Sequence, residues 1–153
     1  MATFNGGQID QAMMFSNAQA VTGAAISDNI IDLSAVRELG NGPRPLYLVS
    51  IVTTTFTDSG DNSNMTVKLQ TDSVSAFNSA TNTQTLGVFA TNTAAGSYLV
   101  AQVGPFNAGE QYLGVYYDVG NGNFTAAAVT TFLTPDITAW VPTAKGYTGP
   151  TTA

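Results

Sequence analysis

The sequence predicts an all-β protein: a single-domain antiparallel β-sandwich of about eight strands, with a jelly roll as the leading topology. Three observations predict this fold. Strand-like runs dominate the chain, turn-forming residues separate them, and all six prolines lie outside the runs or at their margins. Proline cannot donate a hydrogen bond to a strand ladder, so its placement supports the assignment. A chain of 153 residues is long enough to form one domain with its own core.

The clearest strand covers residues 65–71, where Met65, Val67 and Leu69 alternate with polar residues. A period of two is typical of a strand with one buried face. The run 46–56 is rich in β-branched residues and apolar on both faces, which favours a position in the middle of a sheet.

Six weaker or paired runs complete the prediction. The expected strands are 13–21, 24–33, 84–90, 97–103, 111–119 and 124–133. Between the last two, Gly120-Asn121-Gly122-Asn123 favours a tight hairpin, because glycine and asparagine tolerate positive φ. One short helical turn is expected at 73–79, with Asp72 as its candidate N-cap.

The two ends of the chain differ from its middle. We expect an N-terminal arm at 1–12, the sandwich domain at 13–133 and an extended C-terminal arm at 134–153. The arms carry isolated large apolar residues, in which disordered segments are depleted. We interpret four of them as anchors that hold the arms against protein: Phe4, Ile9, Trp140 and Tyr147. The surface that receives them is either their own domain or a groove on a neighbouring subunit.

The composition argues against an enzyme. The chain has no His and no Cys, and 9% of its residues are charged, against about 25% in a typical domain. Most proton shuttles, nucleophiles and metal sites use His or Cys. Polarity comes instead from neutral residues, including 22 Thr. We expect no catalytic residues, no cofactor and no metal.

Charge and hydropathy exclude two further partner classes. The net charge is −6, and the four cations are scattered, whereas nucleic-acid binding needs clustered Lys and Arg. No run of about 18 apolar residues is present, so no membrane span is expected.

Oxygen ligands are concentrated in one turn, where Asp58, Asp61, Asn62 and Asn64 could suit Ca²⁺. Their spacing does not match an EF-hand, and we interpret the segment as a connecting loop. Pairing of Asp118 with Asp136 or Glu110 could also suit acid–base catalysis, but the sequence does not bring these carboxylates together.

Three tyrosines lie in the run 111–119. Tyr112 and Tyr116 should share one strand face, and Tyr117 should take the other. Such a face could stack against sugar rings, and ordinary core and interface packing explains these tyrosines equally well.

Several motifs resemble one known family in order and spacing. They are Ser16-Asn-Ala-Gln-Ala-Val-Thr22, Ala25–Leu33, Arg37–Gly42 running into Leu46–Val49, Val67–Asp72, Gln111–Tyr117 and Phe124–Ala126. Together they resemble the jelly-roll capsid cement proteins of tailed bacteriophages, over roughly residues 13–133. Two departures are Gly114, where the family often has Arg, and Ala127-Ala128, which replaces a Gly-Lys-like pair.

The resemblance implies a protein of the virion that binds the outer surface of an icosahedral capsid and bridges neighbouring capsomers. Its implied partners are the major capsid protein and further copies of itself, with a dimer favoured and a trimer as the alternative. Two other functions stay open: a glycan-binding jelly-roll module of a phage head or fibre, and a structural protein of the tail or neck.

Overall fold

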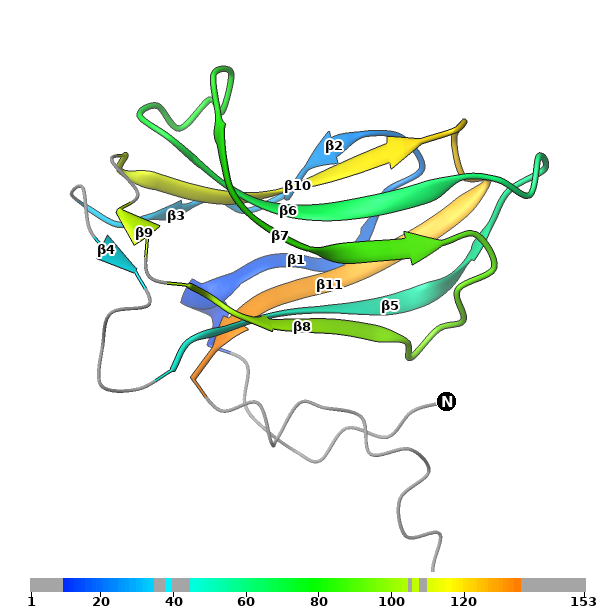
Figure 1. Ribbon diagram of the computed structural model, residues 1–153, viewed down its shortest axis with the longest axis horizontal. Coiled ribbons are helices and arrows are strands. Elements are labelled where there is room, and N and C mark those ends of the chain that lie inside the picture. Colours follow the sequence, from blue (N-terminus) through cyan, green and yellow to red (C-terminus); the bar gives the residue numbers. More distant parts are fainter. Residues whose placement is uncertain (1–9, 35–37, 40–44, 105, 108–109, 136–153) are drawn as a thin grey trace, which may run out of the picture.

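The computed structural model describes residues 10–34, 38–39, 45–104, 106–107 and 110–135, and their regular secondary structure is almost entirely β-strand (Figure 1). The elements are η1 (Gln11–Met13), β1 (Met14–Ala20), β2 (Ala25–Ile26), β3 (Ile31–Asp32), β4 (Glu38–Leu39), β5 (Tyr47–Thr57), β6 (Asn64–Asp72), β7 (Thr81–Ala90), β8 (Tyr98–Gln102), β9 (Phe106–Asn107), β10 (Tyr112–Gly120) and β11 (Ala126–Thr134).

Two antiparallel sheets lie face to face, so the predicted β-sandwich is confirmed (Figure 1). Sheet A has four strands in the order β1-β11-β5-β8. Sheet B has five strands, in the order β2-β10-β6-β7 with β3 also paired to β10. A small third sheet joins β4 to β9.

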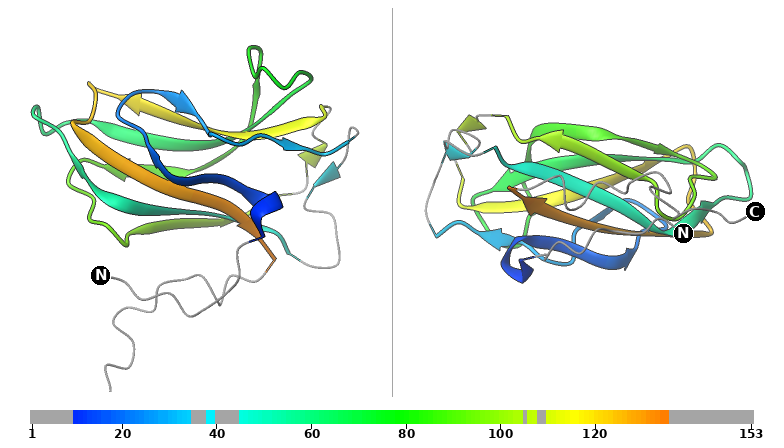
Figure 2. Two further views of the ribbon diagram at one scale, coloured as in Figure 1. Left: turned by 180° about the vertical axis from the view of Figure 1, so that it is seen from behind. Right: turned by 90° about the horizontal axis from the view of Figure 1, so that it is seen from below.

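Strand pairing is nested along the chain. β1 pairs with β11, β2 and β3 with β10, β4 with β9, β5 with β8, and β6 with β7. The chain is therefore one long hairpin, folded back at the β6–β7 connection and wound into two layers. Two further ladders, β11–β5 and β10–β6, complete the sheets. Because the first and last strands are neighbours, both ends of the sandwich leave from sheet A (Figures 1 and 2).

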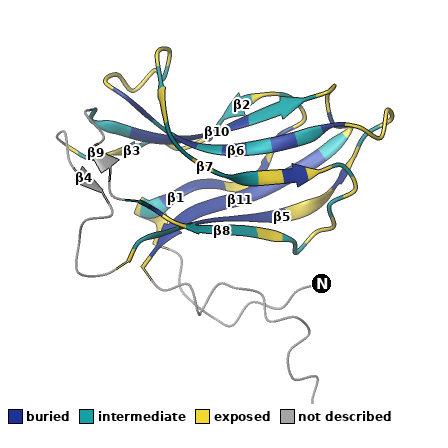
Figure 3. Ribbon diagram, in the orientation of Figure 1, coloured by how far each residue is buried: buried dark blue, intermediate teal, exposed yellow. Residues whose placement is uncertain are grey.

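The core lies between the sheets and follows the predicted period of two. In β6, Met65, Val67 and Leu69 are fully buried, whereas the polar residues between them are partly exposed (Figure 3). β5 lies between β11 and β8, which confirms its predicted place in the middle of a sheet. The core therefore follows from side-chain alternation.

The predicted hairpin at Gly120-Asn121-Gly122-Asn123 is wrong. Asn121 and Gly122 do take positive φ, at 62° and 113°, but β10 and β11 belong to different sheets. The connection crosses from sheet B to sheet A, and Phe124 enters the core directly after it. Turn residues report local backbone conformation, whereas strand pairing depends on residues that are distant in the chain.

Other element boundaries also differ from the prediction. The expected strand 24–33 is divided into β2 and β3, because Ser27 between them exchanges hydrogen bonds with Val115 of β10 through both its backbone and its hydroxyl. The helical turn expected at 73–79 is a loop of bends and turns. The helix η1 and the short strands β4 and β9 were not predicted. β11 includes Thr134, the first residue of the expected C-terminal arm.

Candidate interaction surfaces

The four predicted anchors, Phe4, Ile9, Trp140 and Tyr147, lie outside the described residues. The structure does describe the two ends of the sandwich from which the expected arms would leave. Met14 at the start of β1 is the ladder partner of Phe132 near the end of β11. The chain therefore enters and leaves the sandwich at the same end of sheet A.

The Asp58 loop is organised by the Asp58 carboxylate. Its two oxygens accept hydrogen bonds from the N–H groups of Gly60, Asn62 and Ser63 and from the Ser63 hydroxyl, at 2.8–3.2 Å. The Ser63 hydroxyl bond, followed by the three N–H bonds, lowers the pKa of Asp58 from 3.8 to about 2. Asp61 accepts a hydrogen bond from the Asn92 amide at 2.6 Å. These contacts support the interpretation of this segment as a connecting loop.

The suggested acid–base pairs are not brought together in the described part of the chain. Glu110 precedes one end of β10 and Asp118 lies near the other, so about eight residues, or roughly 26 Å of strand, separate them. Asp136 lies outside the described residues. Asp118 instead forms an ion pair with Lys68 of β6 at 2.7 Å.

Neither a metal-binding cluster nor a membrane-spanning helix occurs among the described residues. Among the described residues, no group of three or more His, Cys, Asp or Glu side chains is placed to hold a metal ion. Within the same residues, no helix has the length and hydropathy needed to cross a bilayer.

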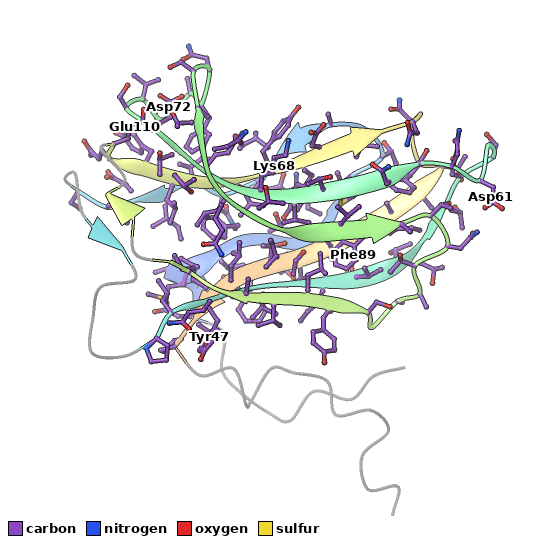
Figure 4. All side chains as sticks on the ribbon, viewed as in Figure 1. Tyr47, Asp61, Lys68, Asp72, Phe89 and Glu110 are labelled. Carbon is purple, nitrogen blue, oxygen red and sulfur yellow. The ribbon has the colours of Figure 1, made fainter. Side chains whose placement is uncertain are left out.

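The outer face of sheet B is a mixed polar and aromatic surface. Tyr112 and Tyr116 point outward and Tyr117 points inward, as predicted, because the side chains of β10 alternate. The Lys68–Asp118 ion pair lies on this face, and Val88 of β7 is 55% exposed there. Figure 4 shows Lys68 in the middle of the sheet. The two side chains are 23% and 44% exposed, and a partly exposed ion pair of this kind contributes little to stability.

One loop, residues 73–79, is held by the buried Asp72 carboxylate at the end of β6. Asp72 accepts hydrogen bonds from the N–H groups of Val74 and Ser79 at 3.1 and 3.0 Å, and from the Ser79 hydroxyl at 3.3 Å. The backbone bond from Ser79 is the largest cause that lowers the pKa of Asp72 below its ordinary value. The loop presents Val74, whose exposed fraction is 43%. Asp72 therefore acts as a loop organiser and not as a helix cap.

The same loop places Phe77 against the outer face of sheet B. Phe77 has φ +51°, and its ring approaches the backbone of Gly114 together with Ile30. Gly114 lies between Tyr112 and Tyr116 on β10. The two tyrosines are therefore separated by other apolar side chains and do not form a continuous stacking platform.

Substitution of Gly114 by Ala tests this packing. A Cβ atom at this position would lie 2.9 Å from both Ile30 Cδ1 and Phe77 Cζ, so one of these side chains must move. We expect the free energy of unfolding in urea to fall by about 1–3 kcal/mol.

Gly104→Ala is the matched control, because nothing lies within 4 Å of a Cβ built there, and we expect its effect to stay within about 0.5 kcal/mol. Equal effects of the two substitutions would contradict the packing of Phe77 on Gly114.

A chain of buried polar groups connects the two sheets. Ser16 Oγ lies 2.6 Å from Gln19 Oε1 and 2.7 Å from the Tyr117 hydroxyl. The Tyr117 hydroxyl donates to Thr131 Oγ1 at 2.8 Å, and Thr131 Oγ1 lies 2.9 Å from Ser50 Oγ. These side chains are between 0 and 9% exposed. Buried hydroxyls need such partners, because an unpaired buried polar group is costly.

Gln19 extends this polar chain to β2 and to the β2–β3 connection. Its Nε2 donates to the Ile26 carbonyl at 2.8 Å, and its Oε1 accepts from the Asp28 N–H at 2.9 Å. Ser16 and Gln19 belong to the first motif of the family resemblance. In the structure this motif therefore supplies hydrogen bonds in the interior and between β1 of sheet A and β2 of sheet B. The sequence alone did not reveal that role.

The outer face of sheet A carries an apolar patch that was not predicted from the sequence. Met14, Phe132, Val49 and Val100 form one cross-strand row over β1, β11, β5 and β8, and Ile51 lies beside it. We call these five residues the outer apolar row. The first three and Ile51 are at most 6% exposed, although they point away from sheet B. Runs that are apolar on both faces, such as 46–56, were the only signal of this second apolar surface.

Comparison with known proteins identifies a family. No curated protein matches the chain. One family model, Bbp16, matches residues 15–133, which span the sandwich from β1 to β11 and cover more than three quarters of the sequence. The chain therefore belongs to the Bbp16 family.

Proposed function

We propose that this chain is a structural cement protein, which binds the outer surface of a phage icosahedral capsid and bridges neighbouring capsomers. The observation that supports the proposal is the antiparallel β-sandwich, in which β1 pairs with β11, β2 and β3 with β10, β5 with β8, and β6 with β7. Most of the motifs that resemble capsid cement proteins lie on or beside these strands, whereas the motif Arg37–Gly42 falls largely outside the described residues. Membership in the Bbp16 family covers the same residues.

A cement role fits the physical character of the chain. A clamp on a shell needs a rigid body and a large contact surface, and it needs no catalytic group. Neutral Thr, Ser, Asn and Gln make hydrogen bonds in an interface without the desolvation cost of buried ions. Many equivalent sites on a symmetric shell convert modest single contacts into strong attachment of an oligomer.

The proposed partners are the major capsid protein and further copies of the chain, with a dimer favoured. The arms at 1–12 and 134–153 would extend the contact beyond the sandwich, with Phe4, Ile9, Trp140 and Tyr147 as their anchors. A net charge of −6 with only four cations argues against nucleic acid as a partner.

The proposal predicts saturable binding to purified mature shells that lack this chain. We expect full-length protein to co-sediment with shells and the W140A/Y147A double variant to bind at least about tenfold more weakly, because buried aromatic anchors dominate protein interfaces. The W140F/Y147F variant keeps aromatic rings at both positions and should retain most of the binding. Shell occupancy that is equal for wild type and W140A/Y147A would refute the role of the C-terminal arm.

Failure to bind shells, combined with binding to isolated tails, would favour the structural tail or neck protein instead. The glycan-binding alternative rests on the outward positions of Tyr112 and Tyr116 on sheet B. Saturable binding on a glycan array, abolished by Y112A/Y116A, would favour it over the cement role.

A further inference from the structure

We propose that the side of the sandwich formed by β7 and β8 binds the same side of a second copy of this chain, about a two-fold axis. This inference rests on one part of the proposed function, the expectation of a dimer, and it names the surface that forms the dimer. It is tested on the isolated protein, so self-association and shell binding can fail independently.

β7 and β8 are the edge strands on one side of the sandwich. β7 ends the strand order of sheet B and β8 ends that of sheet A, with β1 and β2 on the opposite side (Figures 1 and 2). The Gln84 amide of β7 joins the two edges, since its Nε2 donates to the Gln102 carbonyl at 2.9 Å and its Oε1 accepts from the Gly104 N–H at 3.1 Å. The two strands therefore present one continuous surface.

This side belongs to a segment of the chain without any charged residue. Residues 73–109, which include β7 and β8, contain no Asp, Glu, Lys or Arg, so all ten acidic residues and all four cations lie elsewhere in the sequence. Exposed edge strands usually carry charged side chains, above all Lys, because a charge there prevents pairing with another chain. The side formed by β7 and β8 lacks this protection.

The exposed apolar side chains lie in the same segment. Among the residues that the structure describes, the exposed large apolar side chains are Val88, Val74 and Tyr98, with exposed fractions of 55%, 43% and 39%. Val88 lies near the end of β7 and Tyr98 at the start of β8, so both flank the β7–β8 connection. Single exposed apolar residues are ordinary, whereas their restriction to one charge-free segment indicates a protein contact.

β8 also offers backbone groups for pairing. It pairs with β5 without a register shift, and the Val52 N–H of β5 donates to the Ser97 carbonyl just before β8. Because bonded and non-bonded positions alternate in an antiparallel ladder, the N–H and C=O groups of Tyr98 and Val100 point away from β5, toward the open side of the strand. A strand of another chain can bind such groups by β-augmentation.

Charge and symmetry favour a second copy as the occupant of this side. Two copies with a net charge of −6 each repel one another, and they repel least through a side that carries no charge. A two-fold contact also requires a surface that is complementary to itself. The exposed Thr81, Asn82 and Thr85 of β7 meet this requirement, because hydroxyl and amide groups both donate and accept hydrogen bonds.

Sedimentation equilibrium of the full-length protein tests the proposal. We expect a reversible dimer whose dissociation constant rises at least about tenfold in V88K and in Y98K, because each variant places two unpaired ammonium groups in the contact. Ala20→Lys is the matched control, since Ala20 is exposed on β1, the edge strand of the opposite side. Its dissociation constant should stay within about threefold of the wild-type value. Circular dichroism checks that each variant is folded.

A pair of proline substitutions tests the backbone of β8. Val100→Pro removes an N–H that points to the open side, so we expect the sandwich to fold and the dimer to be lost. Ala20→Pro makes the same change on β1, where the N–H of Val21, and not that of Ala20, donates to the Ala127 carbonyl of β11. We expect A20P to dimerise as the wild type does.

The oligomeric state and the effects of the variants decide the proposal. Wild type that stays monomeric to about 1 mM overturns it, and so does a trimer, because a two-fold contact closes at two copies. Equal dissociation constants for V88K, Y98K and A20K place the contact elsewhere and also overturn it. Monomeric wild type whose binding to shells is weakened by V88K and Y98K, but not by A20K, assigns this side to the shell protein instead. A dimer that meets every expectation above without binding shells supports this inference and refutes the cement function.

Discussion

Replacement of Phe56 by Ala is expected to lower the free energy of unfolding by about 3–5 kcal/mol. Phe56 is 0% exposed and lies between the two sheets, where its ring contacts two others. Its centroid is 5.6 Å from that of Phe89 on β7, in an edge-on arrangement with an interplanar angle of 80°. The centroid of Phe124 lies 4.9 Å from that of Phe56, with an interplanar angle of 50°. Removal of the ring creates a cavity and abolishes both aromatic contacts.

Urea unfolding followed by circular dichroism measures this effect. Tyr98→Ala is the control, because it removes a ring that is 39% exposed, and we expect it to cost at most about 1 kcal/mol. A cost below about 1 kcal/mol for F56A would show that these three rings do not pack as a unit.

The second large effect is a loss of stability at high pH that depends on Tyr117. Burial between the sheets raises the pKa of the Tyr117 hydroxyl from 10.0 to about 12. Below pH 10 the hydroxyl is protonated in both states, and its contribution to stability is complete. Between pH 10 and 12 the unfolded chain releases the proton and the folded chain holds it. Stability therefore falls with rising pH, by up to about 3 kcal/mol.

Tyr117→Phe isolates this contribution. At pH 8 we expect the variant to be less stable than wild type by about 1–3 kcal/mol, because Ser16 and Thr131 lose a buried partner. From pH 10 to 12 the difference should narrow, since only wild type carries the buried phenol. Tyr112→Phe, on the outer face of the same strand, should match wild type at pH 8. A difference between Y117F and wild type that stays constant to pH 12 would contradict the burial of this hydroxyl.

For β10, the sequence predicted correctly which way each tyrosine side chain points, but it did not predict which distant residues these side chains and Gly114 contact. Alternation in the run 111–119 correctly predicted that Tyr117 points inward and that Tyr112 and Tyr116 point outward. It did not predict that Tyr117 meets Ser16, because 101 residues separate the two in the sequence. Nor did it predict that Phe77, held by the Asp72 loop, covers Gly114 between the outward tyrosines. A pattern with period two reports the face of a side chain and not its partner.

The amino-acid sequence alone determined the fold class, the alternating strand faces and the central place of β5, because these depend on residues within a few positions of one another. Only the tertiary structure decided that β10 and β11 join different sheets, that Ser16 and Gln19 serve the interior, and that sheet A has a second apolar surface around Phe132. Each of these depends on which distant strands pair. Which strands pair depends on the free energy of the whole sandwich, and a short stretch of sequence does not determine that free energy.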